Sequence, residues 1–148
     1  MEIHLIRQGK TTTNEHPFCC DQLDLPLSNK GILELLAFKK QGIYPESINS
    51  FFTNGLLRSE QTLSLLYGSV HVKVISQLSE YCFDSFEILA SIAQRDKSVL
   101  AVCHGAVISN IMEHLFPRRQ RFYEWQPAPG RGYTIFHSCE GVLVYKKI

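Results

Sequence analysis

The chain has 148 residues, of which 45% are hydrophobic and 20% are charged, as expected for one compact domain. Its 15 basic and 14 acidic residues leave a formal charge of +1, which excludes a global charge able to gather nucleic acid or an anionic membrane surface. The five cysteines fit neither a disulfide framework nor paired zinc ligands, and no apolar run reaches the roughly twenty residues of a membrane span. We therefore expect a single cytoplasmic domain over residues 1–148, with reduced thiols.

The N-terminal segment predicts a strand followed by a helix. The strand covers residues 2–6 and stops at a polar loop, residues 7–14, that is rich in hydrogen-bond donors. Apolar residues at helical spacing follow Ser28, which can serve as the N-cap, and Gly42 can end this amphipathic helix.

A second strand and helix are expected next. The strand covers residues 48–53, and Asn54 can cap a helix that runs to Gly68. Arg58 therefore falls in the first turn of this helix. A further strand and a short helix are expected over residues 70–75 and 86–94.

The clearest strand of the chain is a nearly continuous apolar run over residues 98–103. It ends at His104 and leads directly into a helix that Pro117 closes. A terminal pair of strands is expected over residues 133–136 and 142–145.

Strands that alternate with helices predict an α/β fold, here a three-layer α/β/α sandwich around a mainly parallel sheet. In such sheets ligands bind outside the carboxyl ends of the strands. The residues expected just past those ends are Arg7, Gln8, Asn54, Arg58, His104 and Gly105.

This set of side chains suits an anion. The fixed fork of arginine donates two hydrogen bonds to anionic oxygens and keeps its charge, so Arg7 and Arg58 together can hold a phosphoryl group. The first turns of the helices after Asn54 and His104 add backbone N–H groups and positive dipole ends. We expect a phosphate site that needs no metal and no cofactor.

Five motifs follow one another in chain order. The first is Leu5-Ile6-Arg7-Gln8-Gly9-Lys10-Thr11 with Asn14. The others are Asp24-Leu25-Pro26-Leu27-Ser28 with Gly31, the segment from Thr53 to Thr62, Leu78-Ser79-Glu80 with Phe83 to Glu87, and Val102-Cys103-His104-Gly105. Together they resemble the motifs of the histidine phosphatase family, which includes the phosphoglycerate mutases and whose first motif is Arg-His-Gly-Glu-Thr.

The resemblance implies roles for the matched positions. Glu80 would protonate the leaving oxygen as general acid, a role that a partly protonated carboxyl can fill. His104 would act beside it in catalysis and also contact the phosphoryl group. The implied phosphate-binding residues are Arg7, Asn14, Arg58, His104 and Gly105.

Three positions depart from the family pattern. The family forms a phosphohistidine where this chain has Gln8, and an amide nitrogen cannot attack phosphorus because its lone pair is delocalised into the carbonyl. Lys10 replaces the usual glutamate and adds positive charge. The stretch 87–99 is shorter than in the mutases, where a helical lid lies, so we expect an open pocket without mutase specificity.

Other candidate groups have plainer explanations. The remaining histidines lack metal-ligand spacing. Cys103 lies next to His104, but strand alternation turns its side chain to the opposite face, toward the core. The basic and aromatic segment 118–125 is expected to be a solvated helix end rather than a nucleic-acid site.

Three hypotheses for function follow. The first is a pseudoenzyme of the phosphatase type that binds a phosphorylated small molecule or inorganic phosphate and hydrolyses it very slowly or not at all. The second is an active phosphomonoesterase, a hydrolase that uses water directly or whose natural parent carries histidine at position 8. The third is a partner-binding scaffold with an idle pocket. Retention of an intact phosphate ligand would favour the first hypothesis, and turnover would favour the second. Absence of anion binding would favour the third.

Overall fold

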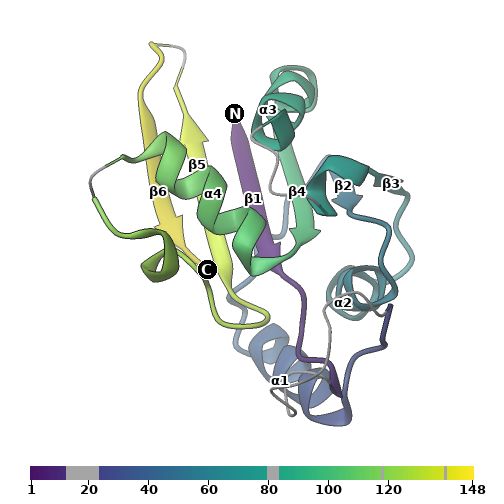
Figure 1. The fold of residues 1–148 in the computed structure, drawn as a ribbon. Helices are drawn as coiled ribbons and strands as arrows, with labels where there is room; N and C mark the ends of the chain where they lie inside the picture. The colour runs from purple at the N-terminus through teal and green to yellow at the C-terminus, as the bar shows by residue number, and fades with distance from the viewer. Residues whose placement is uncertain (13–23, 80–83, 118, 139) are drawn as a thin grey trace.

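The computed structural model describes residues 1–12, 24–79, 84–117, 119–138 and 140–148. At its centre is a six-stranded sheet in the order β3-β2-β4-β1-β5-β6 (Figure 1). The strands are β1 (Glu2–Arg7), β2 (Ser50–Thr53), β3 (Val72–Val74), β4 (Ser98–Cys103), β5 (Gly132–His137) and β6 (Leu143–Lys147). The helices are α1 (Asn29–Lys40), α2 (Leu57–Tyr67), α3 (Asp84–Asp96) and α4 (Gly105–Leu115), with short 3-10 turns η2 (Ser76–Ser79) and η3 (Phe122–Glu124).

Four neighbouring strands of the sheet are parallel. β4 lies between β1 and β2, and β2 continues the parallel pairing to β3. β5 pairs antiparallel with β1, and β6 pairs antiparallel with β5. The predicted mainly parallel sheet is therefore confirmed, and the expected terminal pair supplies its antiparallel edge.

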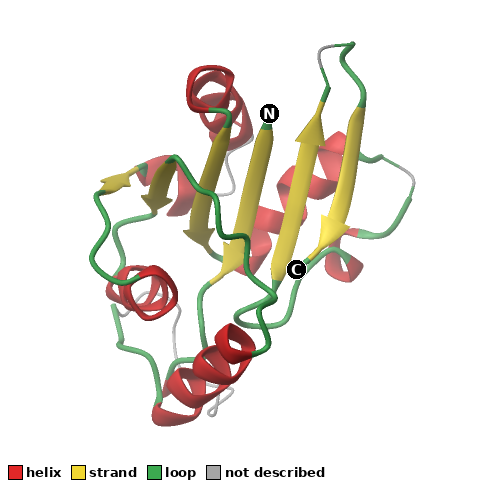
Figure 2. Ribbon diagram, turned by 180° about the vertical axis from the view of Figure 1, so that it is seen from behind, coloured by secondary structure: helices red, strands yellow, loops and turns green. Residues whose placement is uncertain are grey.

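Helices cover both faces of the sheet, as Figures 1 and 2 show from opposite sides. One core lies between the sheet and the α3–α4 layer, and it includes Leu89, Ile108 and Ile111. A second core lies on the other face under α1 and α2, with Leu35 and Leu63 at its centre. β4 is buried along its whole length because it is covered on both sides. This arrangement is the predicted three-layer α/β/α sandwich.

The start of α1 follows the prediction. The Ser28 hydroxyl accepts a hydrogen bond from the Gly31 amide at 3.0 Å, as an N-cap does. Gly31 is required there for a second reason, because a Cβ atom at this position would overlap the carbonyl oxygen of Lys10. The start of α1 therefore packs closely against the loop that follows β1.

The start of α2 differs from the prediction. The helix begins at Leu57 with Leu56 as its N-cap, so the expectation that Asn54 caps it is wrong. Gly55 has a positive φ of 81°, so the backbone makes a tight turn between Asn54 and the start of the helix. The Asn54 side chain serves that turn instead, since its Oδ1 accepts from the Leu56 amide at 3.2 Å.

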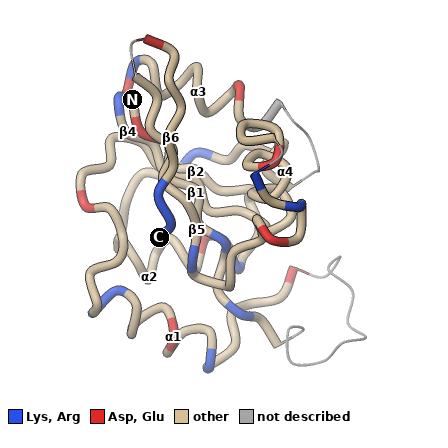
Figure 3. Tube along the Cα trace, turned by 90° about the vertical axis from the view of Figure 1, so that its left-hand side faces the viewer, with Lys and Arg blue, Asp and Glu red and all other residues tan. Residues whose placement is uncertain are grey.

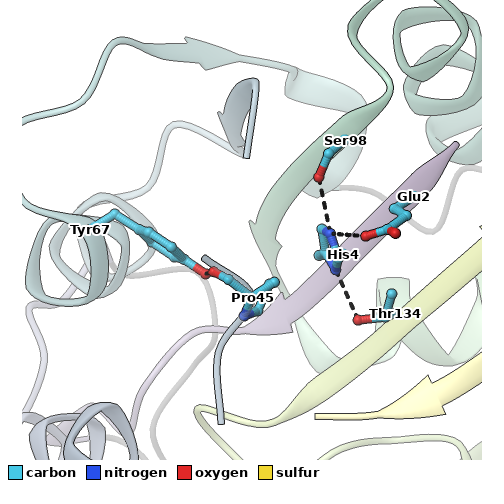
Figure 4. Close-up of polar contacts among 6 residues, drawn as sticks. All are labelled: Glu2, His4, Pro45, Tyr67, Ser98 and Thr134. Carbon is cyan, nitrogen blue, oxygen red and sulfur yellow. Dashed lines mark hydrogen bonds and ion pairs between the residues drawn. The ribbon is translucent and has the colours of Figure 1, made fainter. Parts of the chain in front are cut away.

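A buried histidine links three strands on the face covered by α1 and α2 (Figure 4). His4 is only 2% exposed; its Nδ1 lies 2.8 Å from Thr134 Oγ1 on β5, and its Nε2 lies 3.2 Å from Ser98 Oγ on β4. Burial lowers the pKa of His4 to about 4, so its ring is neutral at pH 7. Its role is structural, and it lies away from the carboxyl ends of the strands.

Charged residues are spread along the chain trace rather than gathered on one face (Figure 3). Of the helices in the described ranges, none combines the length and the apolar character that a membrane crossing requires.

Candidate functional site

The carboxyl ends of the three central parallel strands meet at one edge of the sheet. β1 and β4 end in register, with Arg7 opposite Cys103, and Thr53 at the end of β2 lies opposite Val102. The segments that leave these strands therefore start side by side. They bring together Gln8, Arg58 and His104, three of the predicted site residues.

The side chain of Gln8 lies at the centre of this group. One end of its amide is 2.9 Å from the Cys103 carbonyl oxygen, and the other end is 3.3 Å from Arg58 Nε and 2.9 Å from His104 Nδ1. A carbonyl oxygen can only accept and an arginine Nε–H can only donate. The amide nitrogen therefore faces Cys103, and the amide oxygen faces Arg58 and His104, because only this orientation gives every atom a suitable partner.

Arg58 is a buried cation, with 4% of its surface exposed. It lies in the first turn of α2, as the sequence predicted. The same helix is tied to the loop after β1 by Thr62, whose hydroxyl donates to the Arg58 carbonyl at 2.7 Å and accepts from the Gly9 amide at 3.0 Å. These bonds hold the backbone of Arg58 beside Gln8.

His104 is the N-cap residue of α4, in extended conformation. Gly105 begins the helix, and Arg7 packs against it: a Cβ atom at Gly105 would lie 2.9 Å from Arg7 Cδ and 3.0 Å from Arg7 Nε. The absence of a side chain at position 105 thus lets the guanidinium of Arg7 lie close to the start of α4. At that end of a helix, backbone N–H groups and the dipole favour an anion.

The loop before β5 holds Arg7 from the other side. Arg7 Nη1 donates to the Pro127 carbonyl at 2.8 Å. The Arg7 amide donates to the Arg131 carbonyl at 2.9 Å, and the Gly130 amide donates to the Arg7 carbonyl at 2.9 Å. The guanidinium is therefore pre-positioned, which lowers the entropy that a ligand must overcome to bind it.

Lys10 adds less free positive charge than the sequence suggested. Its Nζ lies 2.9 Å from Glu34 Oε1 on α1, and both side chains are partly buried. The ion pair is a contact between distant segments that the residue pattern did not reveal.

Asn54 lies just past the end of β2, where the sequence placed it both at a helix cap and among the residues of the candidate site. It is buried, and its Nδ2 has no hydrogen-bond partner within the described residues. Buried donors are rarely left in this state, so such an atom calls for a ligand, a water or another explanation. The Asn54 carbonyl accepts from the Ser79 hydroxyl at 3.2 Å, which places the residue before Glu80 at the end of β2.

Two predicted site residues, Asn14 and Glu80, lie outside the described residues. Within the described part of the chain, no group of three or more His, Cys, Asp or Glu residues could hold a metal ion.

Cys103 is fully buried in the core on the α3–α4 face. Burial raises the pKa of its thiol to about 12, so it carries no thiolate at pH 7. The prediction that its side chain points toward the core is confirmed, and Cys103 is excluded as a replacement nucleophile.

Comparison with known proteins now defines the family. The model of the histidine phosphatase superfamily, branch 1, matches residues 3–97. The chain belongs to this superfamily. A comparison with curated protein sequences finds no match.

Solved structures of several phosphatases share the fold at low sequence identity. The alpha-ribazole phosphatase from Shigella flexneri is 16% identical with a TM-score of 0.79, covering 99% of this chain and 95% of that one. A phosphoserine phosphatase variant from Entamoeba histolytica, in complex with phosphoserine, is 17% identical with a TM-score of 0.76, covering 97% and 94%. The protein histidine phosphatase SixA, complexed with tungstate, is 17% identical with a TM-score of 0.70, covering 100% and 96%.

Proposed function

We propose that this member of the histidine phosphatase superfamily binds a phosphorylated small molecule or inorganic phosphate and hydrolyses it very slowly or not at all. The proposed ligand-binding residues are Arg7, Asn14, Arg58, His104 and Gly105.

The observation that carries the proposal is the hydrogen-bonded cluster of Gln8, Arg58 and His104 at the carboxyl ends of the parallel strands. A buried guanidinium that is already oriented binds an oxyanion at little entropic cost. Arg7 lies against the start of α4 in the same region and adds a second fork. Two permanent cations and a helix N-terminus favour a dianion over a neutral ligand.

Solved neighbours support the class of ligand. One phosphoserine phosphatase was solved with phosphoserine, and SixA was solved with tungstate, a tetrahedral oxyanion. Phosphoserine carries a phosphoryl group, and tungstate resembles that group in its tetrahedral shape and negative charge. We therefore propose a tetrahedral oxyanion on a small molecule as the group that this chain recognises.

Loss of covalent catalysis follows from the chemistry of position 8. The Gln8 nitrogen has no available lone pair and donates to the Cys103 carbonyl, so it cannot form a bond to phosphorus. Cys103 offers no thiolate in its place. Glu80 is proposed as the general acid that remains, on the ground that it matches the family motif.

The test is oxyanion-dependent thermal stability of the whole chain. Phosphate, sulfate and vanadate at millimolar concentrations should raise Tm, since a ligand that binds only the folded state stabilises it. At ten times its Kd an anion stabilises by about 1.4 kcal/mol, which corresponds to a shift of about 4 °C for a domain of this size. Absence of a shift with all three anions contradicts the proposal and favours an idle pocket.

Variants separate the site from general anion effects. Arg58→Lys keeps the charge at a buried position but loses the fork, and it should lose most of the shift. Arg95→Ala removes an exposed arginine from the end of α3 and should keep the full shift. Equal shifts in the two variants would place anion binding elsewhere on the molecule.

A further inference from the structure

Gln8 connects the three segments that build the candidate site. Its amide nitrogen donates to the carbonyl at the end of β4, and its amide oxygen accepts from Arg58 on α2 and from His104 at the start of α4. The Gln8 backbone amide also donates to the Cys103 carbonyl, at 3.1 Å. A side chain with these bonds orients its neighbours even though it performs no chemistry.

The contact with His104 determines which ring nitrogen carries a proton. An amide oxygen only accepts, so Nδ1 of His104 must bear the hydrogen that points at Gln8. In the neutral ring the second nitrogen, Nε2, then has a lone pair and no hydrogen. It becomes a donor only when the ring takes up a second proton.

The contact with Arg58 likewise determines which nitrogens of that side chain can meet a ligand. Its Nε–H is committed to the Gln8 oxygen, so an anion meets this side chain through the Nη groups at the end of the fork. Arg58 and His104 thus each direct one nitrogen, Nε and Nδ1 respectively, at the Gln8 amide oxygen.

We infer that Gln8 is a positioning residue, which holds His104 in the Nδ1–H tautomer and so couples anion binding to uptake of one proton on His104 Nε2. This inference rests on the proposed function for the anion, whereas the tautomer follows from the contacts alone. The family's nucleophile position would thus have become a fixed hydrogen-bond acceptor.

The charges near His104 give the physical reason for the coupling. Within the described residues, the charged groups brought to this cluster are the guanidiniums of Arg7 and Arg58. The adjacent Cys103 thiol is neutral because burial raises its pKa to about 12. A dianion bound beside His104 favours the protonated ring, because a nearby opposite charge stabilises the charged form.

The first experiment reads the tautomer without any ligand. Long-range ¹H–¹⁵N NMR of the full chain at about pH 8 reports the protonated nitrogen of each ring, and His104→Gln assigns the signal. We expect Nδ1–H for His104 in the unmodified chain and in Gln8→Glu, which keeps an acceptor, and a tautomer mixture in Gln8→Ala. Gln41→Ala, at an exposed position after α1, should change nothing. A predominant Nε2–H form in the unmodified chain overturns the inference.

The second experiment measures the proton that accompanies the anion. Sulfate is the probe because it does not titrate near neutral pH, and calorimetry in buffers of different ionisation heat counts the protons taken up. We expect about one proton per sulfate and an affinity that falls about tenfold per pH unit once His104 is neutral. In Gln8→Ala no amide oxygen favours a hydrogen on Nδ1, so the neutral His104 ring can carry its hydrogen on Nε2 and donate it to the anion. The proton uptake and the pH dependence of the affinity should therefore both be smaller.

The outcomes separate the two proposals. Sulfate binding without proton uptake overturns the coupling and leaves the proposed function standing. No sulfate binding at any pH overturns the proposed function and the coupling together, while an Nδ1–H signal that depends on Gln8 still establishes the positioning role.

Discussion

The end of the Gln8 side chain lies 2.9 Å from His104 Nδ1, although 96 positions separate the two residues in sequence. Their contact joins the first strand of the sheet to the helix after β4. Any group placed at position 8 therefore faces the imidazole and the buried guanidinium of Arg58 directly, which makes this position the most informative one to change.

Substitution of Gln8 by histidine should restore phosphatase activity. An imidazole has the lone pair that the amide lacks, and Arg58 and His104 are already beside it. We expect negligible hydrolysis of an aryl phosphate by the unmodified chain, with or without divalent metal. Gln8→His should gain about a hundredfold or more, because groups that act as a unit lose nearly all activity when one is missing. An acid-labile phosphoenzyme should accompany the gain.

Two controls make this result specific. Gln8→Asn tests whether any change at position 8 raises activity, and it should not. Adding His104→Ala to Gln8→His should remove the gain. Strong turnover by the unmodified chain that survives His104→Ala would show that the chemistry happens at another site.

The buried amide of Asn54 should contribute to anion binding. In Asn54→Asp the acceptor for the Leu56 amide is kept, but the Nδ2 donor is replaced by a negative oxygen that repels an anion. We expect the Tm increase caused by sulfate to disappear. The comparison of Tm with and without sulfate for each variant cancels any change in basal stability.

The same substitution at the other end of β2 is the control. Asn49→Asp changes an exposed residue just before the strand and should keep the sulfate effect. If Asn54→Asp also keeps it, the Asn54 side chain has no part in the site.

The buried ring of His4 should make the fold sensitive to mild acid. Its pKa in the folded chain is about 4, below the ordinary 6.5, because burial disfavours the charged ring; Glu2, 3.5 Å away, is half exposed and offsets little of this. As pH falls from about 6.5 to about 4, His4 takes up a proton in the unfolded chain but stays neutral in the folded chain. The free energy of unfolding should therefore decrease by about 3 kcal/mol over this interval.

Urea unfolding at a series of pH values measures this loss. His4→Gln can still bond to Thr134 and Ser98 but does not titrate, so its stability should fall less over the same interval. His71→Gln, at an exposed position, should behave as the unmodified chain does. Identical pH profiles for the unmodified chain and His4→Gln would show that another group is responsible.

Much of the fold was predictable because its elements have strong local signals. The apolar run 98–103 coincides with β4 to the residue, since a strand covered on both faces needs no polar positions. Ser28 was recognised as an N-cap because a hydroxyl before an amphipathic segment satisfies a free amide at short range. Arg58 was correctly predicted in the first turn of α2, because a capping signal precedes an apolar helical segment there. The predicted cap, Asn54, was wrong because the turn at Gly55 moves the N-cap to Leu56.

The tertiary structure alone decided the relations between distant side chains. Nothing local in the sequence shows that Lys10 pairs with Glu34, that Asn54 is left with a buried donor, or that the Gln8 amide turns its oxygen to His104. Such contacts depend on the order in which strands join the sheet and on how closely the helices approach it. A residue pattern records the direction and burial of each segment, but the orientation of one amide is set by all of its neighbours at once, and those come from three separate parts of the chain.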